Sequence, residues 1–261
     1  MYRLCTACLW IALAAVAAGQ TQPSTRPVGA LRMAVINADL DRVVELLDTG
    51  VDVDFRDEDG ATALHYAAAF NRRKVAELLL ERGAQIDARD ADDRTPLHLS
   101  AFGGCADTTL LLLERGADAH AVDTGGFTPL HAAGGNREEG RRGTARIVRL
   151  LIERGDADVN AVSTETGATP LHVAVSSNNV AVAAALLDAG AQIDATDDAG
   201  RTPLHVAAAC GWHETVQLLI DRKATIIVRD GAEKLPAELA EENGHEAVAK
   251  LLRAAAAKGP V

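Results

Sequence analysis

Histidine is the residue type whose spacing in this sequence first suggests chemistry. Five of the eight histidines recur at steps of 33, 33, 41 and 33 residues. Imidazole acts as a general base and as a metal ligand near neutral pH, so a regular row of histidines could supply either bases or ligands. The five are His65, His98, His131, His172 and His205.

The other histidines give no sign of a metal site. His120 and His213 have no cysteine or histidine close by at the spacing that zinc sites use. Glu214 follows His213, but Gln217 stands where an H-E-x-x-H site needs its second histidine. We therefore expect no metal and no cofactor.

Neighbouring acidic residues could form an acid and base pair or hold calcium. They occur as Asp57, Glu58, Asp59 and as Asp92, Asp93, among turn-forming residues. No EF-hand spacing accompanies them, so we interpret them as solvated turn residues. Ser176 and Ser177 lie outside any G-x-S-x-G elbow. No active-site constellation remains, and we expect that the protein is not an enzyme.

The five histidines belong to a longer repeat, which must position them. Each ends a four-residue pattern of threonine, proline or alanine, leucine and histidine. Threonine can cap a helix, proline is favoured in a first helical turn, and leucine then begins a buried stripe. Continuing the period outward gives seven units, of which the first and last are degenerate, as caps should be. The units lie near residues 29–61, 62–94, 95–127, 128–168, 169–201, 202–234 and 235–258.

Glycine marks a second fixed point in the repeat. Gly83, Gly116 and Gly190 each follow the signature threonine by 21 residues and close an apolar run. Glycine adopts the left-handed conformation of a helix C-cap at no steric cost, and we expect the same of Gly155 in its unit. Lys223 breaks the rule, so the sixth unit should end differently or be strained.

This pattern resembles that of the ankyrin repeat family, whose 33-residue unit carries the same T-P-L-H signature. The resemblance covers residues 28–258. It implies an all-α repeat solenoid in which each unit has a β-turn followed by two antiparallel helices. It also implies that the signature histidines hydrogen-bond neighbouring backbone. The segments rich in Asp and Gly would then project as fingers beside the first helices and form a concave groove with them.

The first residues differ from the rest of the chain. Residues 1–19 combine an early arginine, an apolar stretch and a small-residue ending, which is typical of a signal peptide, and residues 20–27 form a short linker. We expect cleavage after Gly19 and a periplasmic or secreted protein. The alternative is a leader that is retained as an anchor.

The charge of the chain restricts its partners. A formal net charge of −11, with no basic run longer than residues 72–74, argues against nucleic acid and against anionic membrane surfaces. Solubility is the simple explanation, and an acidic surface that selects a basic partner is the alternative. We expect a monomer.

Three phenylalanines are candidate anchors for a partner. Phe70 and Phe102 fall near the ends of first helices, and Phe127 precedes the signature at a finger tip. Aromatic side chains dominate binding hot spots, although each phenylalanine could instead pack on its neighbouring unit.

The long fourth unit supplies the remaining candidates. Its extra residues fall mainly at 136–144, where the polar Asn136, Arg137, Arg141 and Arg142 would join two helices near the rim of the groove. Insertions in repeats often map to a binding face, but a functionless insertion also costs little. We therefore predict a non-catalytic module that binds a protein partner through its concave groove. A structural spacer is the alternative, and an unrecognised enzyme is a third possibility.

Overall fold

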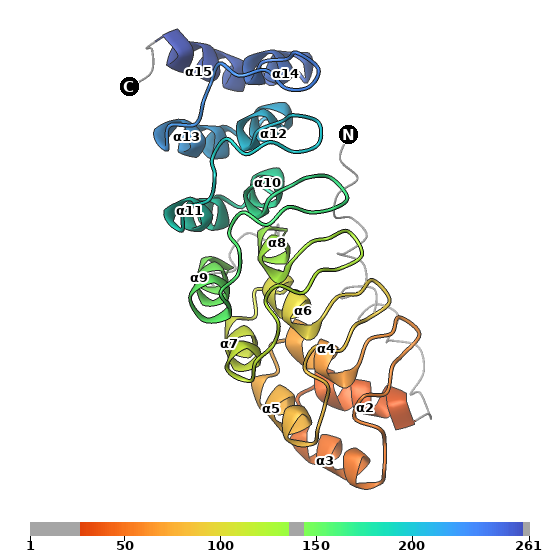
Figure 1. Cartoon of the computed structure of the whole chain (residues 1–261). Helices are drawn as coiled ribbons and strands as arrows, with labels where there is room; N and C mark the ends of the chain where they lie inside the picture. Colours follow the sequence, from red (N-terminus) through yellow and green to blue (C-terminus); the bar gives the residue numbers. More distant parts are fainter. Residues whose placement is uncertain (1–26, 136–143, 258–261) are drawn as a thin grey trace.

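The computed structural model describes residues 27–135 and 144–257, in which helices are joined by turns and no strand occurs. The helices stand in two parallel rows, and the connecting segments extend past the inner row (Figure 1). Each unit contributes one helix to each row, and consecutive helices within a row pack against each other. The predicted all-α repeat solenoid is thus confirmed.

The described residues form seven helix pairs. The inner row contains α2 (Pro27–Ile36), α4 (Ala63–Ala69), α6 (Pro96–Phe102), α8 (Pro129–Gly134), α10 (Pro170–Ser176), α12 (Pro203–Cys210) and α14 (Pro236–Glu242). The outer row contains α3 (Leu40–Asp48), α5 (Arg73–Glu81), α7 (Ala106–Glu114), α9 (Thr144–Gly155), α11 (Val180–Asp188), α13 (His213–Asp221) and α15 (Glu246–Ala257). The segments that lead from an outer helix to the next inner helix are called fingers. They are residues 51–61, 84–94, 117–127, 157–168, 191–201 and 224–234.

Small aliphatic side chains form one continuous core between the two rows. The signature leucine of each unit begins this core, because it points inward from the first turn of its inner helix. All five are completely buried, namely Leu64, Leu97, Leu130, Leu171 and Leu204. Since each layer is only two helices thick, alanine, valine and leucine fill it without bulky aromatic residues.

Outer helices end on a left-handed residue, which is glycine in most units. Gly83, Gly116 and Gly190 have φ angles of 89°, 87° and 91°, and Lys223 occupies the same conformation with a φ of 67°. The expectation for Gly155 was wrong.

In the fourth unit the outer helix continues through Gly155, and the left-handed residue is Asp156, with a φ of 53°. The unit has one extra residue at this point, so its helix ends one position later. Gly155 is needed for another reason, since a Cβ atom there would lie 2.7 Å from the Cβ of Ala119 in the preceding finger.

Candidate functional site

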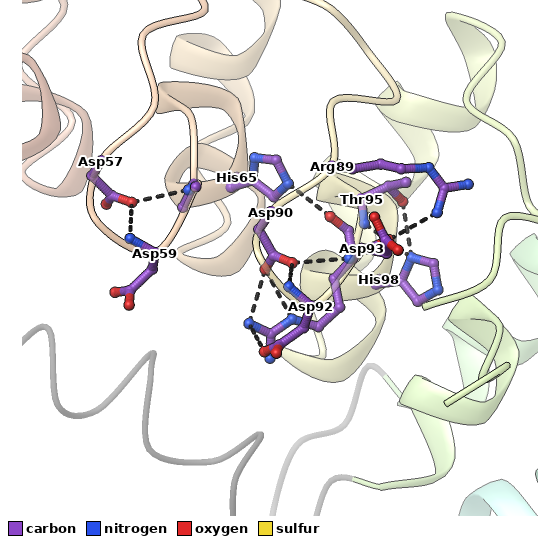
Figure 2. Close-up of polar contacts among 12 residues, drawn as sticks. Asp57, Asp59, His65, Arg89, Asp90, Asp92, Asp93, Thr95 and His98 are labelled. Atoms are coloured by element: carbon purple, nitrogen blue, oxygen red, sulfur yellow. Dashed lines mark hydrogen bonds and ion pairs between the residues drawn. The ribbon is translucent and has the colours of Figure 1, made fainter. Parts of the chain in front are cut away.

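The signature histidines connect each unit to the next. In the second unit the backbone N–H of Thr62 donates to Nδ1 of His65 at 3.1 Å. Nε2 of His65 lies 3.0 Å from the carbonyl oxygen of Arg94 (Figure 2). A backbone N–H can only donate and a carbonyl can only accept, so the ring is neutral and carries its proton on Nε2. The other four signature histidines make the same two hydrogen bonds. Nδ1 accepts from the N–H of the signature threonine, and Nε2 donates to the carbonyl of Phe127, Ala168, Arg201 or Lys234.

These histidines are unsuited to work as bases or as an exposed row of ligands. Burial lowers the pKa of His98 and of His131 to about 4, and it also lowers the pKa of His65, His172 and His205. Both ring nitrogens are engaged in hydrogen bonds, so neither is available to a substrate. In the part of the chain that the structure describes, no group of three or more His, Cys, Asp or Glu side chains is placed to hold a metal ion.

The aspartate five residues before the signature threonine closes the turn of its finger. Oδ1 of Asp90 accepts hydrogen bonds at 2.9 Å from the backbone N–H groups of Asp92 and Arg94, while Oδ2 pairs with the Arg94 guanidinium at 2.8 Å (Figure 2). Asp57 acts in the same way in the first finger, where it also accepts a hydrogen bond from the hydroxyl of Tyr66. The interpretation of Asp57 as a solvated turn residue was therefore wrong, because its carboxylate is half-buried and holds the turn together.

The residue directly before the signature threonine, at the junction of a finger and its inner helix, differs between units. Arg94 and Arg201 occupy this position in two units, and each is ion-paired at 2.8 Å to an aspartate of its own finger. In the two units between them the position holds Phe127 and Ala168 instead. These two units therefore lack the arginine and aspartate pair that is present on either side of them.

A groove of about 280 Å³ opens where the arginines are replaced. We call it the central groove, and it lies between the fingers and the inner helices α6, α8, α10 and α12. Its main lining residues are Leu99, Phe102, Phe127, Ala132, Glu165, Val173 and Val206.

Small residues at the centre of the inner row leave room for the central groove. In four successive units the residue after the signature histidine lines the groove, and Ala132 in α8 is smaller than Leu99, Val173 and Val206 at the same position of the other three. Gly134 lies two residues after Ala132 in α8. A Cβ atom at Gly134 would lie 2.9 Å from the backbone nitrogen of Ala174. The α8 and α10 helices therefore pack closely under the groove.

The predicted anchor residues divide into two groups. Phe102 and Phe127 both line the central groove, although they come from different elements, the end of α6 and the third finger. Phe70 does not line it, because this side chain packs against the hydrophobic core. The Phe127 ring also meets His131 edge to face, with 5.4 Å between the ring centroids. The predicted binding residues Asn136, Arg137, Arg141 and Arg142 lie outside the described residues.

The central groove has an acidic rim. The carboxylate of Asp123 accepts hydrogen bonds at 2.9 Å from the backbone N–H groups of Gly125 and Phe127, and burial raises its pKa. Glu165 on the next finger is exposed. Among the residues that the structure describes, neither carboxylate belongs to an ion pair. The sequence named two of the groove's lining residues, Phe102 and Phe127, but it missed the small Ala132 and Ala168, whose signal is the comparison of neighbouring units.

The comparisons with known proteins agree with this architecture. The family model for three copies of the ankyrin repeat matches residues 12–90, 31–123, 116–197 and 191–259. The chain belongs to the ankyrin repeat family. The predicted membership is thereby confirmed, and ankyrin repeat domains generally mediate binding between proteins. Their fold is typical of non-catalytic modules.

Relatives support the fold over most of the chain. The human ASB11 ankyrin repeat domain is 27% identical, with a TM-score of 0.72 over 85% of this chain and 96% of that one. The ankyrin repeat domain of Bcl-3, a member of the IκB protein family, is 28% identical, with a TM-score of 0.68 over 89% of this chain and all of that one. The ankyrin repeat protein RP714 of Rickettsia prowazekii is 47% identical over 45 residues, which are 17% of this chain and 42% of that relative.

No helix within residues 27–135 and 144–257 has both the length and the apolar character that crossing a membrane requires.

Proposed function

We propose that this protein is a non-catalytic module that holds a protein partner in the central groove. The observation that carries the proposal is the absence of the arginine and aspartate pair at two successive fingers, where Phe127 and Ala168 take the place of the arginine. At these fingers Phe102, Phe127 and Ala132 all line the central groove. Two half-exposed aromatic rings beside an unfilled apolar space are what a binding hot spot needs, because burying them on association removes apolar surface from water.

The proposal includes export. The composition of residues 1–19 supports a leader that is cleaved after Gly19, which would place the groove in the periplasm or outside the cell. Mass spectrometry of the protein from the cells that make it tests this, since the N-terminus should be Gln20. Unprocessed full-length protein in the cytoplasm would contradict it.

Affinity capture from the native cell envelope tests the groove itself. We would compare the unmodified protein with the double variant Phe102→Ser, Phe127→Ser. Phe55→Ser is the matched control, because Phe55 is 42% exposed on the first finger and does not line the central groove. Phe70 is left unchanged, since removing a ring that packs on the core would create a cavity. Circular dichroism melting checks that all variants fold.

The result that supports the proposal is a protein retained by the unmodified chain and by Phe55→Ser but lost from the double variant. Equal retention by all three would place the binding site elsewhere on the molecule. If none of them retains a specific protein, the proposal fails, and the result favours the spacer or the enzyme alternative.

A further inference from the structure

We infer that the central groove takes a partner segment in which a lysine or arginine stands next to a bulky apolar side chain. This inference rests on the proposed function and adds the chemistry of the partner. Two features carry it, the apolar floor of the groove and the unpaired carboxylates at its rim.

The floor fits one bulky apolar side chain. Leu99, Ala132 and Val173 follow their signature histidines in successive units, and all three face the groove. Ala132 in the middle is the smallest, so a hollow lies between its larger neighbours. The Phe102 ring lines the same groove. An aromatic or leucine side chain placed there would bury its surface against apolar atoms on several sides.

The rim fits a cation directly beside that side chain. If Gly125 carried a Cβ atom, that atom would lie 2.8 Å from two ring carbons of Phe127 and 2.9 Å from Oε2 of Glu165. An aromatic ring and a carboxylate therefore meet at one place. The stem of a lysine or arginine can lie on the ring while its charged head pairs with Glu165. Asp123, which lies on the same finger as Phe127, adds a second negative charge to the groove.

The charges around this place do not cancel. Arg94 lines the groove, but it is already paired with two aspartates of its own finger, at 2.8 and 2.9 Å. Asp197 is paired with Arg201. Within the described residues neither Asp123 nor Glu165 forms a direct ion pair, although the charge of Arg94 also acts on Asp123. The net charge of −11 over the whole chain also favours the approach of a basic segment.

The test is a selection from a displayed library of short random peptides on the full chain. Ala132→Leu serves for counter-selection, because it fills the hollow with the residue that already occupies position 99 of the preceding unit. The enriched peptides should carry Lys or Arg next to Phe, Trp or Leu. A synthetic copy of one enriched peptide is then titrated by calorimetry.

Two variants separate the apolar and the charged part of the inference. Ala132→Leu should weaken the peptide at least tenfold, since the hollow is filled. Glu165→Gln should weaken it about fivefold, as expected for one exposed ion pair, and more in low salt than in high salt. Glu58→Gln on the first finger is the matched control, because it removes an exposed carboxylate away from the groove.

Several results would overturn the inference. They are the absence of any enriched peptide, enriched peptides without a basic residue, and equal binding to the unmodified protein and to Ala132→Leu. A dimer in sedimentation that Ala132→Leu dissociates would also overturn it, because the occupant would be a second copy of the chain. If envelope capture depends on Phe102 and Phe127 but is unchanged by Glu165→Gln and Ala132→Leu, the proposed function stands and this inference fails.

Discussion

The buried histidines should make the stability of the stack depend on pH between about 7 and 4. His131 is only 1% exposed, and burial lowers its pKa from 6.5 to about 4. The unfolded chain therefore binds a proton more readily than the folded chain. The stabilisation is fully present above pH 6.5 and is lost as the pH falls toward 4. At pH 5 the free energy of unfolding has fallen by about 2 kcal/mol for one such histidine.

The variant His131→Gln isolates this contribution. Glutamine at the third helical position can still accept a hydrogen bond from the N–H of Thr128, as Glu238 does from Leu235 at 2.8 Å in the last unit. It cannot reach the buried carbonyl of Ala168, so the variant should lose about 1–3 kcal/mol at pH 7.5. Its further loss between pH 7.5 and pH 5.0 should be about 2 kcal/mol smaller than that of the unmodified protein.

Urea unfolding followed by circular dichroism at several pH values measures both quantities. His120→Gln is the control, because it removes an exposed imidazole on a finger. The reasoning is refuted if the pH dependence of His131→Gln equals that of the unmodified protein, or if both variants change it by the same amount.

Three further changes test the packing of the repeat. Lys223→Gly should raise the melting temperature by about 1–2 °C, because it relieves a left-handed lysine at the cost of some unfolded-state entropy; an unchanged or lower value would contradict the strain. Gly134→Ala should lower the free energy of unfolding by about 1–3 kcal/mol, since its Cβ would lie 2.9 Å from the nitrogen of Ala174; full stability in urea would show that α8 can shift freely. Arg94→Ala should cost about 3–5 kcal/mol, because it leaves the carboxylate of Asp90 buried without its cation; a loss below 1 kcal/mol in the same assay would mean that water replaces the guanidinium.

Repetition made the fold accessible from the sequence. The signature places Thr62, Leu64 and His65 at the start of an inner helix, and local rules for caps and buried stripes then apply to every unit. These interactions connect residues within one unit or between adjacent units, so the period alone predicts them. Gly155 escaped this reasoning, because an extra residue moved the helix end and a contact with Ala119 gave the glycine a different purpose.

The candidate site was accessible only in part. Phe102 and Phe127 could be named as anchors, because aromatic residues in such a sequence are rare and each stands near the end of an element. Phe70 has the same residue type and a similar position, yet it packs on the core. Its position in the repeat is one residue later than that of Phe102, which turns the side chain from the groove toward the neighbouring layer.

The sequence by itself determined the family and the two-row architecture, and the resemblance implied that the signature histidines hydrogen-bond neighbouring backbone; their neutral state came from the structure. Only the tertiary structure decided where the groove lies. The groove depends on small residues, Ala132 and Ala168, whose effect appears when larger side chains on either side are brought into register with them. An absent side chain leaves no chemical signal in a sequence, and the space that it opens exists only after neighbouring units have stacked.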